Sequence, residues 1–287
     1  MRKLAYFLAT LLSCELWFAA QVIAAEKTLL MGVFPRRNAK MTIRMFKPLS
    51  EYLTKKTGKN IQVTTAKNFP TFFKNVNKGR YDIVHYNQLQ YIESNAKHGY
   101  TVIAQNEEFK TKSIKSAIVV RKDSGINSVK DLKGKTILFG GGKKAFVAYV
   151  ANAVMLNRAG LGKYDYVTKF AKNPPNATIA TFLKQGDAAG IGDAGLKSPI
   201  LKNKGVDVSE LKIVVLGDQP LPHLPWAVSK SMSVDVRNSI QKAILSLNDS
   251  AEGKKILKKA GMTGLHKAED KDYDSSRKLI KEFKLIN

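Results

Sequence analysis

A run of three glycines followed by two lysines has the clearest chemistry in this sequence. Gly140-Gly141-Gly142-Lys143-Lys144 separates an expected strand at 136–139 from an expected helix at 145–159. The first backbone N–H groups of a helix are free and lie at the positive end of its dipole, so this segment favours a bound anion. It is not a P-loop, because no Ser or Thr follows the lysines and the spaced first glycine is missing.

The two lysines make the same segment unusual. Lysines in the first turn oppose the helix dipole, unless a negative group lies beside them or their side chains stay in water. We therefore predict that an anion contacts Gly141, Gly142, Lys143 and Lys144. The alternative is a flexible turn with solvated lysines.

Two arginines, Arg36 and Arg37, follow the first expected strand at 28–34. Arginine can hold an oxyanion with two parallel hydrogen bonds. Both are therefore candidate ligand-binding residues, although exposed arginines are also common on protein surfaces.

Three further polar residues are candidates because of their positions. His85 and Asp193 each directly follow an expected strand, and in open α/β sheets ligands bind at the carboxyl ends of strands. His223 lies between two prolines, in a segment that could reach the same cleft. Alternatively, His85 is a buried structural histidine and the prolines beside His223 stiffen a hinge.

Enzymatic chemistry finds little support in the sequence. It contains no G-x-S-x-G motif, and its one cysteine, Cys14, lies in the N-terminal segment. The four histidines lack the spacing of metal ligands, although His85 and His223 could meet across a cleft and bind a metal or a metal complex. We expect a protein that is not an enzyme, with no catalytic residues, no resident metal and no cofactor.

The hydrophobic pattern predicts strands and helices that alternate along the chain. A first series of strands is expected at 28–34, 61–65, 81–84 and 101–104, with helices between them. A second series is expected at 116–121, 136–139, 166–170, 188–192 and 213–216, and helices near 234–247, 251–259 and 273–283 complete the chain. This rhythm indicates parallel sheets covered by helices on both faces.

The N-terminal segment predicts export. Arg2 and Lys3 precede an apolar run, and Ala24 and Ala25 offer small residues for cleavage, so residues 1–25 are expected to be a signal peptide. Glu15 interrupts the apolar stretch, which disfavours a membrane anchor. Residues 11–14 resemble a lipobox, which leaves a lipid anchor at Cys14 as an alternative.

The net charge is strongly positive, at +25. It could serve nucleic-acid binding, attraction to an anionic surface, or attraction of an anionic solute. The lysines and arginines occur mostly singly or in pairs along the chain, which is typical of a solvated surface and disfavours a nucleic-acid-binding tract.

Four segments together resemble a known family. They are Gly32-Val33-Phe34-Pro35, Tyr81-Asp82-Ile83-Val84-His85-Tyr86, Asp131-Leu132-Lys133-Gly134-Lys135 and Phe182-Leu183-Lys184-Gln185-Gly186-Asp187-Ala188-Ala189. In this order they are similar to the phosphate, phosphite and phosphonate substrate-binding proteins of ABC transporters. The resemblance covers essentially all of residues 26–287.

The resemblance implies a type II periplasmic binding protein, in which two doubly wound α/β lobes are joined by two crossing segments and close on a ligand through a hinge. Lobe 1 would comprise 26–117 and 218–287, and lobe 2 would comprise 118–217. The crossings are expected near 116–121 and 217–226. Tyr86 matches a tyrosine that contacts ligand in this family, and Phe69 stands where the family usually has an aromatic contact, although a core role for Phe69 is equally compatible.

The resemblance also implies partners and a compartment. We expect a periplasmic monomer that binds a small phosphorus-type oxyanion, delivers it to an ABC permease in the inner membrane and does not bind nucleic acid. The alternative is a ligand-binding accessory protein for a periplasmic sensor kinase. Phosphonate-binding members have a Ser/Thr-rich loop where this chain has its glycines and lysines, so the resemblance leaves the ligand itself open.

Overall fold

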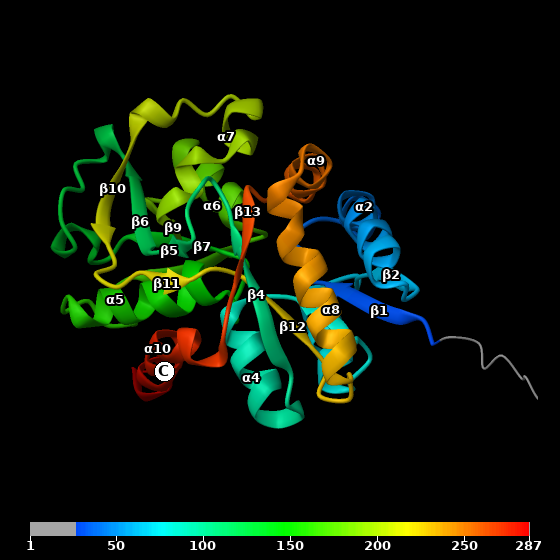
Figure 1. Ribbon diagram of the computed structural model, residues 1–287. Helices are drawn as coiled ribbons and strands as arrows, with labels where there is room; N and C mark the ends of the chain where they lie inside the picture. The colour runs from blue at the N-terminus through cyan, green and yellow to red at the C-terminus, as the bar shows by residue number, and fades with distance from the viewer. Residues whose placement is uncertain (1–26, 287) are drawn as a thin grey trace, which may run out of the picture.

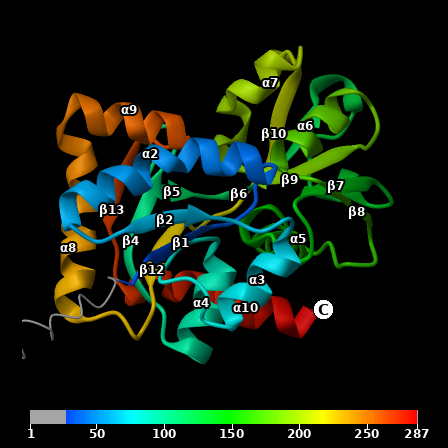
Figure 2. The same cartoon turned by 90° about the vertical axis from the view of Figure 1, so that its right-hand side faces the viewer.

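The computed structural model describes residues 27–286, which form two α/β lobes, each built on its own sheet (Figures 1 and 2). The predicted signal peptide and Cys14 lie outside the described residues. None of the described helices is long and apolar enough to cross a membrane.

The first lobe has six strands in the order β13-β4-β12-β3-β1-β2. Their bounds are β1 Leu29–Val33, β2 Ile61–Thr64, β3 Ile83–His85, β4 Thr101–Glu107, β12 Pro225–Val228 and β13 Gly264–Lys267. Three helices connect the first four strands: α2 Ala39–Thr57, α3 Phe69–Asn77 and α4 Gln88–His98. β1 is parallel to β2 and β3, as predicted, but β12 inserts antiparallel between β3 and β4, so the sheet is mixed.

The second lobe has five strands in the order β10-β6-β9-β7-β8. They are β6 Ser116–Arg121, β7 Thr136–Gly140, β8 Val167–Ala171, β9 Ala188–Gly192 and β10 Leu211–Leu216. The helices are the π-helix η3 Phe146–Ala151, α5 Asn152–Arg158, α6 Pro174–Phe182 and α7 Pro199–Asn203. β7 is parallel to β8 and β9, and β6 is antiparallel to both of its neighbours.

Two helix predictions in this lobe were inaccurate at their ends. The helix expected from residue 145 begins as a π-helix at Phe146. The hydrophobic pattern predicts a helix at about 178–184, but α6 begins earlier, at Pro174, because Asn173 caps it by accepting from the Asn176 N–H and prolines favour the first helical positions.

The two lobes are joined by a short antiparallel ribbon, in which β5 (Ser113–Ile114) pairs with β11 (Leu221–Pro222). The sequence predicted the first crossing near 116–121, whereas the paired crossing lies just before this range, at β5. Residues 116–121 form β6, a strand hydrogen-bonded on both sides within the second sheet. A lobe boundary between residues 117 and 118 would therefore cut β6.

The C-terminal part covers both lobes. α8 (Val234–Leu245) and α9 (Ala251–Ala260) pack on the first lobe, and α10 (Asp274–Ile286) lies beside α4 and α5 (Figure 1). Leu279 and Ile280 of α10 share a buried apolar cluster with Phe146 and Val154 of the second lobe. The remaining short helical turns are η1 Lys122–Ser124, η2 Lys130–Leu132, η4 Asp193–Lys197, η5 Val208–Glu210, η6 Ser246–Asp249 and η7 Asp270–Tyr273.

Gly190 of β9 makes room for the packing of η3 against the second sheet. A Cβ at this position would overlap the ring of Phe139 and lie 2.8 Å from the carbonyl oxygen of Ala148. We predict that Gly190→Ala lowers the free energy of unfolding by about 1–3 kcal/mol, as overpacking does, measured by urea denaturation. Gly162→Ala is the control, since its Cβ would meet nothing closer than 3.4 Å. Equal stability of the two variants would contradict this account.

Candidate functional site

A cavity of about 980 Å³ lies between the lobes and is lined by both of them. The first lobe contributes the ends of β1 and the starts of α3 and α4, and the second lobe contributes the segment from Gly140 to Ala148. Of the residues singled out from the sequence, the cavity brings together Arg36, Arg37, Phe69, Gly141, Gly142, Lys143, Lys144 and His223. His85, Tyr86 and Asp193 do not line it.

The glycine segment turns β7 into η3 through backbone angles that favour glycine. Gly141 has a φ of 120° and Gly142 a φ of 143°. A Cβ on Gly140 would overlap the backbone of Pro174. The turn therefore brings the start of η3 to the cavity wall.

The N–H groups at the start of η3 can serve as anion donors. The first N–H groups of a helix have no acceptor within the helix, and Phe146, Val147 and Ala148 all line the cavity. Asn152 holds this π-turn in place, because its side-chain amide donates to the carbonyl oxygens of Val147, Ala148 and Ile191. Single π-turns of this kind are frequent at functional sites.

The two lysines of the segment have different environments. Lys144 Nζ lies 2.9 Å from Glu93 Oε2 of α4 and 5.9 Å from the ring centre of Phe73. A lysine in the first turn of a helix needs a negative group beside it or solvent around it. For Lys144 this negative group is Glu93 of the first lobe. Lys143 is exposed, and no ion-pair partner is recorded for it among residues 27–286.

Arg36 forms an ion pair with Glu108 at the rim of the first lobe. Arg36 Nη1 lies 2.8 Å from Glu108 Oε1, and Asn106 Nδ2 donates to the same oxygen. Burial alone would raise the pKa of Glu108, but the charge of Arg36 and its hydrogen bond to Glu108 outweigh burial and lower this pKa to about 2. Glu108 in turn raises the pKa of Arg36.

Arg37 is a half-buried cation without a matching anion. It lines the cavity, and in the described part of the chain no hydrogen bond or ion pair is recorded for it. Burial, together with the charge of Arg36, lowers the pKa of Arg37. Glu108, the nearby carboxylate, is already paired with Arg36. A bound anion would therefore give the Arg37 guanidinium the charge partner that it lacks.

His223 lines the cavity and its neutral ring carries one N–H. Its Nδ1 accepts a hydrogen bond from the Leu224 N–H at 2.8 Å, so the neutral ring carries its proton on Nε2. Burial lowers the pKa of His223 and Glu108 partly opposes this, so the neutral ring is favoured. Two hydrogen bonds fix the backbone of this residue. The His223 N–H donates to Gln105 Oε1, and the Tyr273 hydroxyl donates to the His223 carbonyl oxygen.

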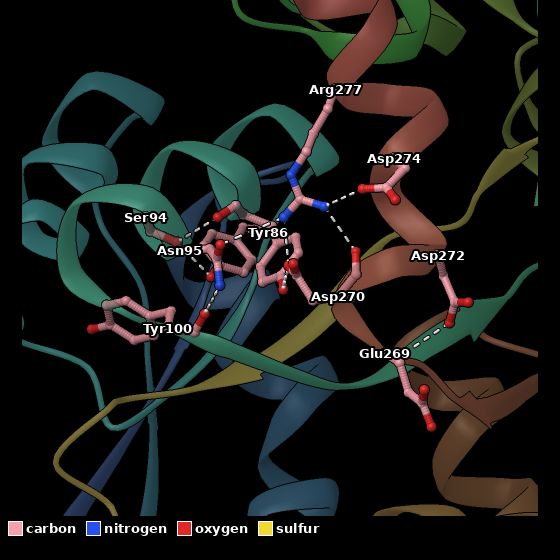
Figure 3. Close-up of polar contacts among 10 residues, drawn as sticks. Tyr86, Ser94, Asn95, Tyr100, Glu269, Asp270, Asp272, Asp274 and Arg277 are labelled. Atoms are coloured by element: carbon pink, nitrogen blue, oxygen red, sulfur yellow. Dashed lines mark hydrogen bonds and ion pairs between the residues drawn. The ribbon is translucent and has the colours of Figure 1, made fainter.

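Tyr86 and His85 are buried in the first lobe, contrary to the expected cleft position. Tyr86 is fully buried and its hydroxyl pairs with Ser94 at 2.7 Å (Figure 3). His85 stacks on Trp226 with ring centres 4.4 Å apart, and its Nδ1 pairs with the Pro225 carbonyl. Side chains alternate between the two faces of a strand, and helices cover both faces here, so neither side chain points out of the strand end.

Asp193 is also placed differently from the expectation. Its carboxylate accepts from the backbone N–H groups of Lys115 and Ala194, at 3.1 and 2.9 Å. These hydrogen bonds connect the start of η4 to the residue that directly follows β5. Asp193 therefore has a structural role outside the cavity.

Several lining residues were missed from the sequence. Glu108 was missed because the fourth strand was expected to end at 104, whereas β4 continues to Glu107. Asn68, Asn87 and Asn173 also line the cavity, and each caps a helix. Asparagine directly before a helical pattern was the signal that could have identified them. No three metal-ligating side chains within residues 27–286 are grouped to hold a metal ion.

Solved structures with the same architecture support the fold. Proteins similar to this chain include a binding-protein component of an ABC phosphonate transporter from Pseudomonas aeruginosa, with a TM-score of 0.76 and 16% identity over 90% of this chain and 87% of that one. PhnD1 from Prochlorococcus marinus, solved with methylphosphonate, has a TM-score of 0.77 and 18% identity over 90% and 99%. XAC2383 from Xanthomonas citri, solved with ATP, has a TM-score of 0.72 and 15% identity over 90% and 98%.

Two lobes on separate sheets, a paired crossing and an interlobe cavity define a type II periplasmic binding protein, which confirms the predicted fold class. A family model described as "ABC transporter, phosphonate, periplasmic substrate-binding protein" matches residues 31–273. The chain therefore belongs to the phosphonate substrate-binding proteins of ABC transporters, and the resemblance seen in the sequence is confirmed.

The Arg36–Glu108 pair should make stability depend on pH. A carboxyl whose pKa falls from 4.5 to about 2 on folding adds about 3 kcal/mol above pH 4.5, and this is lost as pH falls toward 2. We predict that Glu108→Gln lowers the free energy of unfolding most near neutral pH, and that its difference from the wild type shrinks between pH 5 and pH 2.

Urea denaturation across this pH range tests the prediction, with Glu252→Gln on the exposed start of α9 as control. A difference that stays constant with pH, or one matched by the control, would show that the pair does not act as described.

Proposed function

We propose that this member of the family binds a tetrahedral phosphorus oxyanion in the cavity, between Arg37 and the start of η3. The observation that supports this most is the unpaired Arg37, which lines the same cavity as the free N–H groups at the start of η3. His223 Nε2 and Lys143 add donors to this group. Such donors match an anion that is rich in hydrogen-bond acceptors. A neutral solute would not make up for the water that these donors lose when it binds.

The available interactions are sufficient in size for a binding protein. Micromolar affinity corresponds to about −8 kcal/mol, and a hydrogen bond to a charged group contributes about 1.5–3 kcal/mol. A few bonds from Arg37 and the η3 N–H groups therefore supply most of the free energy. Methylphosphonate in the Prochlorococcus protein is a ligand of this class, which supports the assignment.

We further propose that the protein acts in the periplasm as a monomer, is not an enzyme, and delivers its ligand to an ABC permease. The family description and the signal-peptide pattern of residues 1–25 support this route. Closure of the lobes on the β5–β11 ribbon would then signal occupancy to the permease. The comparisons do not favour a role beside a sensor kinase.

Arg37→Ala tests the proposed anion contact. We expect its affinity for phosphate, phosphite and methylphosphonate to fall by about 10- to 100-fold, since one charged hydrogen-bonding group is lost. Isothermal titration calorimetry on refolded protein, freed of any bound solute, measures this. Arg44→Ala is the matched control, because it removes the same charge from an exposed position on α2 outside the cavity. Unchanged affinity in Arg37→Ala, or binding restricted to neutral or cationic solutes, would refute the proposal.

A further inference from the structure

Three phenylalanines form a row along the first-lobe wall of the cavity. The ring centres of Phe34 and Phe69 lie 6.0 Å apart, as do those of Phe69 and Phe73. All three line the cavity, and Phe69 and Phe73 are only half-buried. We call these three residues the phenylalanine row.

Cations lie over both ends of this row, and each is already paired. Arg36 Cζ lies 5.8 Å from the ring centre of Phe34 and is neutralised by Glu108. Lys144 Nζ lies over Phe73 and is neutralised by Glu93. The row is therefore an apolar wall with balanced charge, in contrast to the unpaired Arg37.

The cavity is too large for a bare oxyanion. A tetrahedral oxyanion has five heavy atoms and, at roughly 30 Å³ for each as for a water molecule, fills about 150 Å³. Most of the 980 Å³ would be left to water or to a further part of the ligand. A volume of this size is at the upper end of the range for cavities that hold drug-sized organic ligands.

The two lobes already touch at one rim of the cavity. Lys144 bonds to Glu93 across the lobes, and Asn87 Nδ2 donates to the Lys144 carbonyl at 2.9 Å. On the far side of the interface Arg158 of α5 makes a two-bond ion pair with Glu282 of α10.

We propose that the natural ligand is a phosphonate or phosphate monoester that bears an aromatic substituent. Its oxyanion binds Arg37 and the start of η3, and its ring packs against the phenylalanine row, with Leu224 and Ile114 at the crossing segments closing the apolar compartment. Aromatic rings gain from such edge and offset contacts beyond the burial of their area. This inference rests on the proposed anion site and adds the class of substituent to it.

The test compares four ligands on the refolded full chain by calorimetry: inorganic phosphate, methylphosphonate, phenylphosphonate and phenyl phosphate. We expect the two phenyl compounds to bind at least about tenfold more tightly than methylphosphonate. Comparing the affinities of phenylphosphonate and phenyl phosphate shows whether the ring is preferred on a direct carbon–phosphorus bond or through an ester oxygen. Phe69→Ala should remove most of the advantage in affinity that the phenyl compounds have over methylphosphonate.

Tyr164→Ala is the control, because it also removes an aromatic ring, from a side chain that is 91% exposed and outside the cavity. If phosphate or methylphosphonate binds as tightly as the phenyl compounds, the inference of an aromatic substituent is overturned, while the proposed anion site still stands. That inference is also overturned if the phenyl advantage persists in Phe69→Ala. If none of the four ligands binds, the proposed function fails together with the inference.

Discussion

The turn that connects β7 to η3 is the constraint on which the site depends. Gly141 and Gly142 adopt φ values that residues with a Cβ rarely adopt, and Gly140 packs directly against the backbone of Pro174. The chain can therefore leave the strand and enter a π-turn within a few residues. Because the helix starts this abruptly, Phe146, Val147 and Ala148 at its start line the cavity.

Charge in the cavity is arranged by pairing some cations and leaving others unpaired. Glu108 neutralises Arg36 and Glu93 neutralises Lys144, and both pairs also support aromatic rings of the first lobe. Arg37 keeps its positive charge available. A net charge of +25 would attract any anion, whereas inside the cavity Arg36 is paired with Glu108 and Arg37 has no carboxylate partner among residues 27–286.

The lobes are coupled by more than the two crossing strands. Arg277 of α10 donates to Asp270 and Asp274 (Figure 3). Tyr91 of α4 donates to Asp270, so this end of the helix is fixed to the first lobe. The middle of α10 contributes Leu279 and Ile280 to the apolar cluster with Phe146 and Val154. The C-terminal helix is thus fixed to the first lobe at one end and packs against the start of η3 in the second lobe.

The sequence by itself determined the alternation of strands and helices, the turn at the glycine segment and the family. Each follows from local features: hydrophobic period, glycine backbone freedom and short motifs. The sequence did not determine that β12 separates β3 from β4, or that the first crossing lies at β5, because strand pairing depends on residues far apart in the chain. Likewise, the exposure of His85 and Tyr86, and the partners of Arg36 and Lys144, were decided by tertiary packing. A residue type states what a side chain can bind, whereas only the packed neighbours decide whether that capacity is already used within the protein or remains available to a ligand.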